Sequence, residues 1–106
     1  MAKGGVYINR QLAGTLEKTS EGIYLFRYEN DYYQNAAMPA ISLTLPKTRQ
    51  AYESRFLFPF FYGLLAEGVN KDIQCQLLKI DEEDDFTRLL KTAGEDTIGA
   101  IIVKEI

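Results

Sequence analysis

The chain has 106 residues, of which 46% are apolar and 25% are charged, and its net charge is −3. This size and composition predict one globular domain, residues 1–106, and exclude a disordered chain. Its twelve Lys and Arg residues are scattered among fifteen Asp and Glu residues, which argues against direct binding to nucleic acid.

The N-terminal quarter reads as an antiparallel meander of strands. Residues 6–8 (VYI) are rich in β-forming side chains and residues 9–11 form a polar turn. Leu12, Gly14 and Leu16 then alternate with smaller or polar neighbours. This pattern predicts a hairpin. After a second turn at residues 20–22, residues 23–28 (IYLFRY) predict a third strand with large side chains on both faces.

The middle of the chain is more polar. Residues 29–40 form a polar and aromatic connection. Residues 41–45 (ISLTL) alternate strictly and end at Pro46, which predicts a short strand at a sheet edge or crossover. Residues 47–54 are polar, and we expect a loop there.

Helical spacing begins at Pro59, which is suited to the first turn of a helix. Phe60 and Leu64 lie four positions apart, so a helix is predicted over Pro59–Leu65, and Gly68 ends the segment. The stripe of a second, amphipathic helix is predicted from helical spacing and consists of Val69, Ile73, Leu77 and Ile80.

A third, short helix is predicted after Asp84 and Asp85, because acidic residues favour the positive end of a helix. Gly94 is its expected C-cap. Residues 98–103 (IGAIIV) then predict a closing buried strand. The expected fold is α+β, a small curled antiparallel sheet of about five strands with two to three helices in the C-terminal half.

The residues do not form a recognisable catalytic set. The chain has no histidine and one cysteine, Cys75, so an imidazole base, a thiolate metal site and an internal disulfide are all excluded. The acidic run 81–85 lacks the spacing of an EF-hand and is interpreted as a solvated, helix-capping loop. Tyr32 and Tyr33 could stack on a ring ligand, but packing is the favoured interpretation. We therefore expect no enzyme, no metal and no cofactor.

The longest apolar run, residues 56–66, has eleven residues, whereas a membrane-spanning helix needs about 20. The N-terminal residues also lack the apolar segment of a signal peptide. With one cysteine, the chain fits a reducing compartment. The expected location is the cytoplasm.

Four segments in order carry a resemblance to a known family. They are LAGTL (12–16), MPAISLTLP (38–46), PFFYGLLAEG (59–68) and GEDTIGAIIV (94–103). Together they resemble the N-terminal subdomain of bacterial HipA-type serine/threonine kinase toxins, in which phrases such as P-L-S-L-S-L-P, P-F-F-x-G-L-L-P-E-G and G-x-D-x-x-G-A recur. The resemblance covers essentially the whole chain.

The family's ATP-binding and catalytic segments lie in a kinase body that follows this subdomain, so the resemblance carries over no catalytic residue. A free-standing copy resembles HipS of the three-gene HipBST toxin–antitoxin systems, which binds the kinase HipT and neutralises it while HipB binds DNA. The resemblance thus implies an antitoxin or regulatory partner of a HipA- or HipT-type kinase, with a HipB-like protein reached through the complex. The alternative is a structural subunit that completes a split HipA-like kinase without inhibiting it.

The aromatic segment has two interpretations. Its side chains either all belong to the core, as aromatic runs usually do, or some of them form an exposed patch that docks on the kinase. The candidate partner-binding residues are Phe60, Phe61, Tyr62, Glu67, Gly68 and Val69. The family commonly has a bulky residue, often Trp, at the position of Val69, and a Pro at that of Ala66. Without a partner, a homodimer could bury such a patch.

Overall fold

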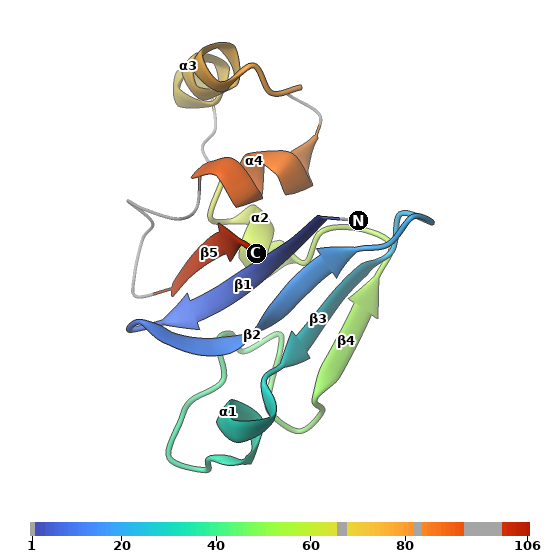
Figure 1. Ribbon diagram of the computed structural model, residues 1–106, viewed down its shortest axis with the longest axis vertical. Coiled ribbons are helices and arrows are strands. Elements are labelled where there is room, and N and C mark those ends of the chain that lie inside the picture. The colour runs from blue at the N-terminus through green and yellow to red at the C-terminus, as the bar shows by residue number, and fades with distance from the viewer. Residues whose placement is uncertain (1, 66–67, 82–83, 93–100) are drawn as a thin grey trace.

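The computed structural model describes residues 2–65, 68–81, 84–92 and 101–106. The sheet has five antiparallel strands in the order β4-β3-β2-β1-β5 (Figure 1). The strands are β1 (Ala2–Ile8), β2 (Gln11–Lys18), β3 (Tyr24–Tyr28), β4 (Ala51–Ser54) and β5 (Ile101–Glu105). The helices are α1 (Asn30–Gln34), α2 (Pro59–Tyr62), α3 (Gly68–Leu78) and α4 (Asp85–Thr92). The predicted α+β class is confirmed.

The predicted hairpin is confirmed as β1 and β2. Its turn consists of Asn9 and Arg10, both at positive φ (50° and 70°), and Ile8 pairs with Gln11. Two successive residues at positive φ are the geometry of the two-residue turn that matches the twist of paired strands. The second predicted turn is also present, with Gly22 at φ 84°.

Two predictions in the middle of the chain were wrong. Residues 41–45 form a loop, and the fourth strand is β4, which lies within the segment expected to be a loop. The buried Tyr28 hydroxyl holds residues 41–45 out of the sheet: it accepts from the Ile41 N–H at 3.1 Å and donates to the Leu45 carbonyl. Because a side chain satisfies these backbone groups, the segment buries Ile41 and Leu45 without pairing as a strand.

Burial raises the pKa of the Tyr28 phenol above 10.0, and burial has the same effect on Tyr32. Both phenols are therefore neutral in the folded state at a pH where an unfolded chain already loses its tyrosine protons. The stability that this provides is complete below pH 10.0 and falls as the pH rises toward the folded-state pKa values.

We expect the free energy of unfolding, measured in denaturant at increasing pH, to decline above pH 10.0. The variant Tyr28→Phe has no phenol to ionise at this position, so its stability should decline less steeply over the same range. An equal decline in both proteins would contradict the assignment to Tyr28.

The core lies between the sheet and the helices α2 and α4. Val6, Leu16 and Phe26 line this face of the three central strands, and Phe61, Leu89 and other helical side chains pack against them. Gly4 on β1 permits close approach of α4, because a Cβ at this position would lie 2.6 Å from Leu90 Cδ2. The close contact fixes α4 against the sheet.

The predicted third helix is confirmed as α4. Asp84 caps it, accepting from the Thr87 N–H at 3.1 Å and from the Thr87 hydroxyl at 2.8 Å. Its expected C-cap, Gly94, lies outside the described residues, as do residues 98–100 of the predicted closing strand; the described part of that strand is β5. The short helix α1 was not predicted, because its residues were interpreted as part of the polar connection 29–40.

Candidate partner-binding surface

The aromatic segment folds into the single helical turn α2. Pro59 occupies the first turn, as predicted, while Gly63 caps the C-terminal end and shortens the helix relative to the expected Pro59–Leu65. Phe58 before the turn and Leu65 after it are buried. The core interpretation therefore holds for part of the segment.

Phe61 is fully buried and occupies the centre of an aromatic cluster. Its ring centroid lies 5.7 Å from that of Phe26, 6.2 Å from that of Phe58 and 5.2 Å from that of Phe60. With no exposed surface, Phe61 supports the surface from beneath and does not itself offer a contact to a partner. This corrects its place among the candidate contact residues.

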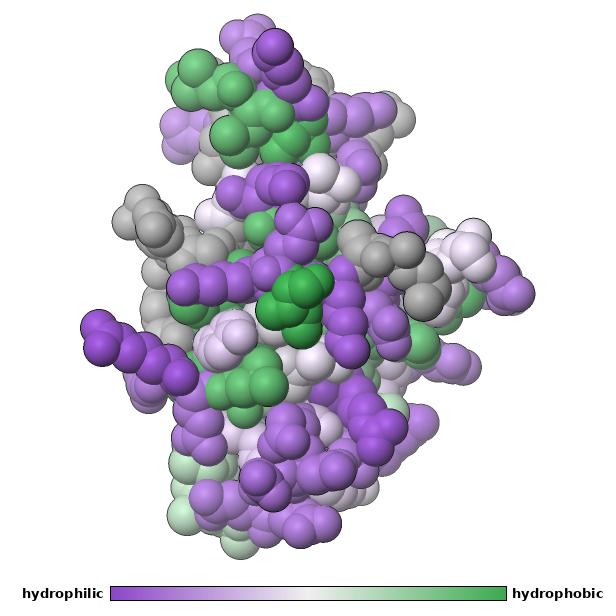
Figure 2. Space-filling model, in the orientation of Figure 1, coloured by the Kyte–Doolittle hydropathy of each residue, from purple (hydrophilic) through white to green (hydrophobic). Residues whose placement is uncertain are grey.

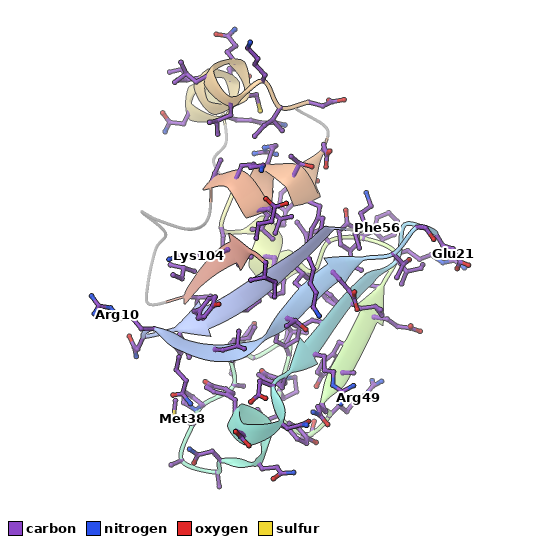
Figure 3. The ribbon with its side chains drawn as sticks, viewed as in Figure 1. Arg10, Glu21, Met38, Arg49, Phe56 and Lys104 are labelled. Carbon is purple, nitrogen blue, oxygen red and sulfur yellow. The ribbon has the colours of Figure 1, made fainter. Side chains whose placement is uncertain are left out.

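Tyr62 and Phe60 are the members of the aromatic segment on α2 that reach the surface. Tyr62 is 46% exposed, and Phe60 is half-buried against the core. A third aromatic side chain, Phe56, is 79% exposed and precedes α2 (labelled in Figure 3). Sequence reasoning missed Phe56 because it belongs to the same apolar run as buried residues.

The remaining candidates follow α2 in the chain. Glu67 lies outside the described residues, and the backbones of Gly68 and Val69 form the first turn of α3. Helices α2 and α3 both contact α4. The candidate surface is the helical end of the molecule, whereas the loop containing Met38 and Arg49 lies at the α1 end (Figures 1 and 3).

The predicted helix is confirmed as α3, but its apolar stripe is not buried. Of the four predicted stripe residues, Ile80 lies beyond the end of the helix, and the side chain of Val69 is outside the described part of the structure. Ile73 is 47% exposed, Leu77 is 77% exposed and Leu78 is 49% exposed, whereas Cys75 is buried. Figure 2 shows hydrophobic side chains gathered over α3. Helical periodicity identified Ile73 and Leu77 as members of a stripe, but it could not show whether the rest of the domain covers them.

Helix α3 ends in a regular C-terminal cap. Lys79 adopts a left-handed conformation at φ 56°, and the Ile80 N–H donates to the Cys75 carbonyl at 3.0 Å. These are features of a Schellman motif, which usually has glycine at the left-handed position. The cap fixes the end of α3 directly after Leu78, so the exposed apolar residues lie on regular helix.

Within the described residues, no group of three or more His, Cys, Asp or Glu side chains could hold a metal ion.

Tyr32 packs as expected. It is buried, its ring stacks on that of Tyr28 with centroids 6.0 Å apart, and the Lys47 ammonium lies 5.0 Å from its ring centroid. Its hydroxyl donates to the Pro39 carbonyl at 2.6 Å. Tyr33 also stacks on Tyr28 and is half-buried against the core.

None of the helices in the described part of the chain has the length and apolar character needed to cross a membrane.

Comparison with known proteins identifies the class to which this fold and sequence belong. The family model of the HipA N-terminal domain matches residues 5–104. A solved structure, the N-terminal domain of HipA toxin, is 31% identical, with a TM-score of 0.74 over 100% of this chain and 93% of that chain. The chain belongs to the HipA N-terminal domain family.

Two relatives show the domain in different contexts. An uncharacterized protein of Haemophilus influenzae is 33% identical over 96% of this chain, and the match covers 91% of that protein. The "Putative kinase Y4mE" of Sinorhizobium fredii is 28% identical over 91% of this chain, but the match covers only 23% of its length. The domain thus makes up nearly all of one relative and about a quarter of the other.

Proposed function

We propose that the chain is a non-catalytic, cytoplasmic module that binds a HipA- or HipT-type serine/threonine kinase and restrains it, as an antitoxin does. The observation that carries this proposal is the pair of contexts in which the domain occurs. In the Y4mE relative it is joined to a much longer remainder, and in the Haemophilus influenzae relative it makes up almost the whole protein. A domain that occurs both joined to a longer chain and nearly alone is suited to bind, as a separate protein, a kinase that lacks it.

The surface around α2 supports the same proposal. Tyr62 on α2 is an exposed aromatic side chain, and aromatic side chains often supply most of the binding energy of an interface. The buried Phe61 holds α2 against the sheet, so that Tyr62 is presented by a supported turn. A HipB-like DNA-binding protein would be reached through the kinase.

The second candidate is a structural subunit that completes a split HipA-like kinase without inhibiting it. It rests on the same Y4mE context, in which the domain is part of the longer chain. The two functions have opposite effects on the kinase, since a restraining partner lowers its activity and a completing subunit raises it.

The first experiment is a pull-down of the tagged chain from its native host, with the recovered proteins identified by mass spectrometry. We expect to recover a HipA-family kinase that lacks its own N-terminal domain. Autophosphorylation of that kinase is then measured with and without the chain. Inhibition supports the antitoxin function, activation supports the completing subunit, and a failure to recover any kinase at good bait yield contradicts both.

Tyr62→Ala should weaken recovery of the kinase by about tenfold, as expected for loss of one aromatic anchor. The matched control is Leu43→Ala, because Leu43 is also an exposed apolar residue but lies in the loop between α1 and β4. Equal loss in both variants would argue against a specific surface at α2.

A further inference from the structure

The direction in which α3 faces has a consequence for binding. Residues two positions before and after a given residue lie on the opposite side of a helix. Ile73 and Leu77 stand in this relation to Cys75, which is buried. The helix therefore turns a small side chain inward and its large apolar stripe outward.

This arrangement is unusual for a helix of a soluble domain, whose apolar stripe ordinarily faces the core. A single exposed leucine needs no explanation, but a group of adjacent exposed apolar residues marks an interaction surface. Ile73 and Leu77 lie four positions apart on one face of α3, and Leu78, which is 49% exposed, borders them. We call these three residues the α3 stripe.

The residues beside the α3 stripe indicate what kind of partner surface could cover it. Asn70 and Gln76 are exposed and lie three positions before Ile73 and three positions after it, so they flank the stripe. Both carry neutral amides. The exposed charged residues Asp72 and Lys79 lie next to Ile73 and Leu78 in the chain. An apolar strip with such a polar and charged rim fits an apolar groove with a polar edge.

The position of strand β5 indicates which partner would lie close to the α3 stripe. In a protein where this domain is N-terminal, the following body begins after β5. The end of β5 is tied to α4, because Lys91 Nζ donates to Glu105 Oε1 at 3.0 Å. Helix α4 is also the packing partner of α3. A kinase body that continues from β5 thus begins at the helical end of the domain.

We propose that the α3 stripe docks into an apolar groove on the body of a HipA-family kinase. This inference rests on the proposed function and adds to it the surface and the chemistry of contact. A kinase body that is a separate chain would bind the domain in the same position as a kinase body that follows the domain in one chain.

The test compares the tagged wild-type chain with Leu77→Asp and Leu43→Asp in the same pull-down. Leu77 and Leu43 are 77% and 100% exposed, so neither substitution disturbs the core, which thermal unfolding followed by circular dichroism checks. We expect Leu77→Asp to lower recovery of the HipA-family kinase by about tenfold to a hundredfold. Leu43→Asp should leave recovery unchanged.

The other outcomes separate this inference from the proposed function. Equal recovery by all three proteins would overturn the role of the α3 stripe and leave the kinase partner in place. Recovery of no kinase by the wild type would overturn the proposed function and the occupant named here. Sedimentation of the purified chain covers the remaining case: a dimer that Leu77→Asp dissolves would show that a second copy covers the stripe, which also contradicts the proposal.

Discussion

Replacing Phe61 by alanine is expected to lower the free energy of unfolding by about 3–5 kcal/mol, the range for truncating a buried phenylalanine. Phe61 is fully buried and contacts the rings of Phe26, Phe58 and Phe60. Its removal leaves a cavity between α2 and the sheet that these rings cannot fill without moving. Equilibrium unfolding in urea, followed by circular dichroism, measures the change.

The matched control is Tyr62→Ala, the next residue on the same helical turn. Tyr62 is 46% exposed, so truncation there should cost no more than about 1 kcal/mol, as for most surface substitutions. The pair separates stability from binding, because Phe61→Ala should reduce kinase recovery only as far as it unfolds the domain. A small cost for Phe61→Ala would mean that α2 is not anchored as described.

The second large effect is expected at Gly14. A Cβ at this position would lie 2.4 Å from the Arg27 carbonyl oxygen and 3.0 Å from two ring atoms of Phe26. The carbonyl belongs to the paired strand β3 and cannot move without breaking the β2–β3 register. Gly14→Ala should therefore destabilise the protein by about 2–3 kcal/mol, as overpacking does, and the same urea experiment measures it.

Gly63 provides the control for this substitution. A Cβ there would meet backbone oxygens at 3.4 and 3.5 Å, and the residue has φ −66°, which any amino acid adopts. Gly63→Ala should be neutral or should stabilise the protein by about 0.4–1 kcal/mol through the unfolded state. If both substitutions cost the same, the close approach at Gly14 is not the cause.

Local signals predicted most of the fold. The hairpin follows from the β-rich run before Asn9 and Arg10, and α4 follows from Asp84 and the helical spacing after it; in both cases neighbouring residues determine the structure. The strand expected at residues 41–45 failed for a non-local reason, since the Tyr28 hydroxyl that holds that loop is distant in sequence. The residues of β4 are polar because it is an edge strand, where one side meets solvent.

The candidate surface was predicted only in part. The sequence located the aromatic segment and the stripe of α3, but spacing alone does not show which side chains the rest of the domain covers. Phe61 and Tyr62 are adjacent and both aromatic, yet one is buried and the other exposed. The exposure of Phe56 and Leu77 also depends on how α2 and α3 are placed on α4, which is a tertiary property.

The pairing of β1 with β5 determines how the domain responds to mechanical force. Gly4 pairs with Glu105, and the Ile106 N–H donates to the Lys3 carbonyl at 3.0 Å, so the beginning and the end of the described chain lie side by side. Tension between these ends acts along the inter-strand hydrogen bonds, which run perpendicular to the strands. The bonds then open in sequence, as in a zipper, instead of sharing the load, so pulling on the ends separates β5 from β1 at low force.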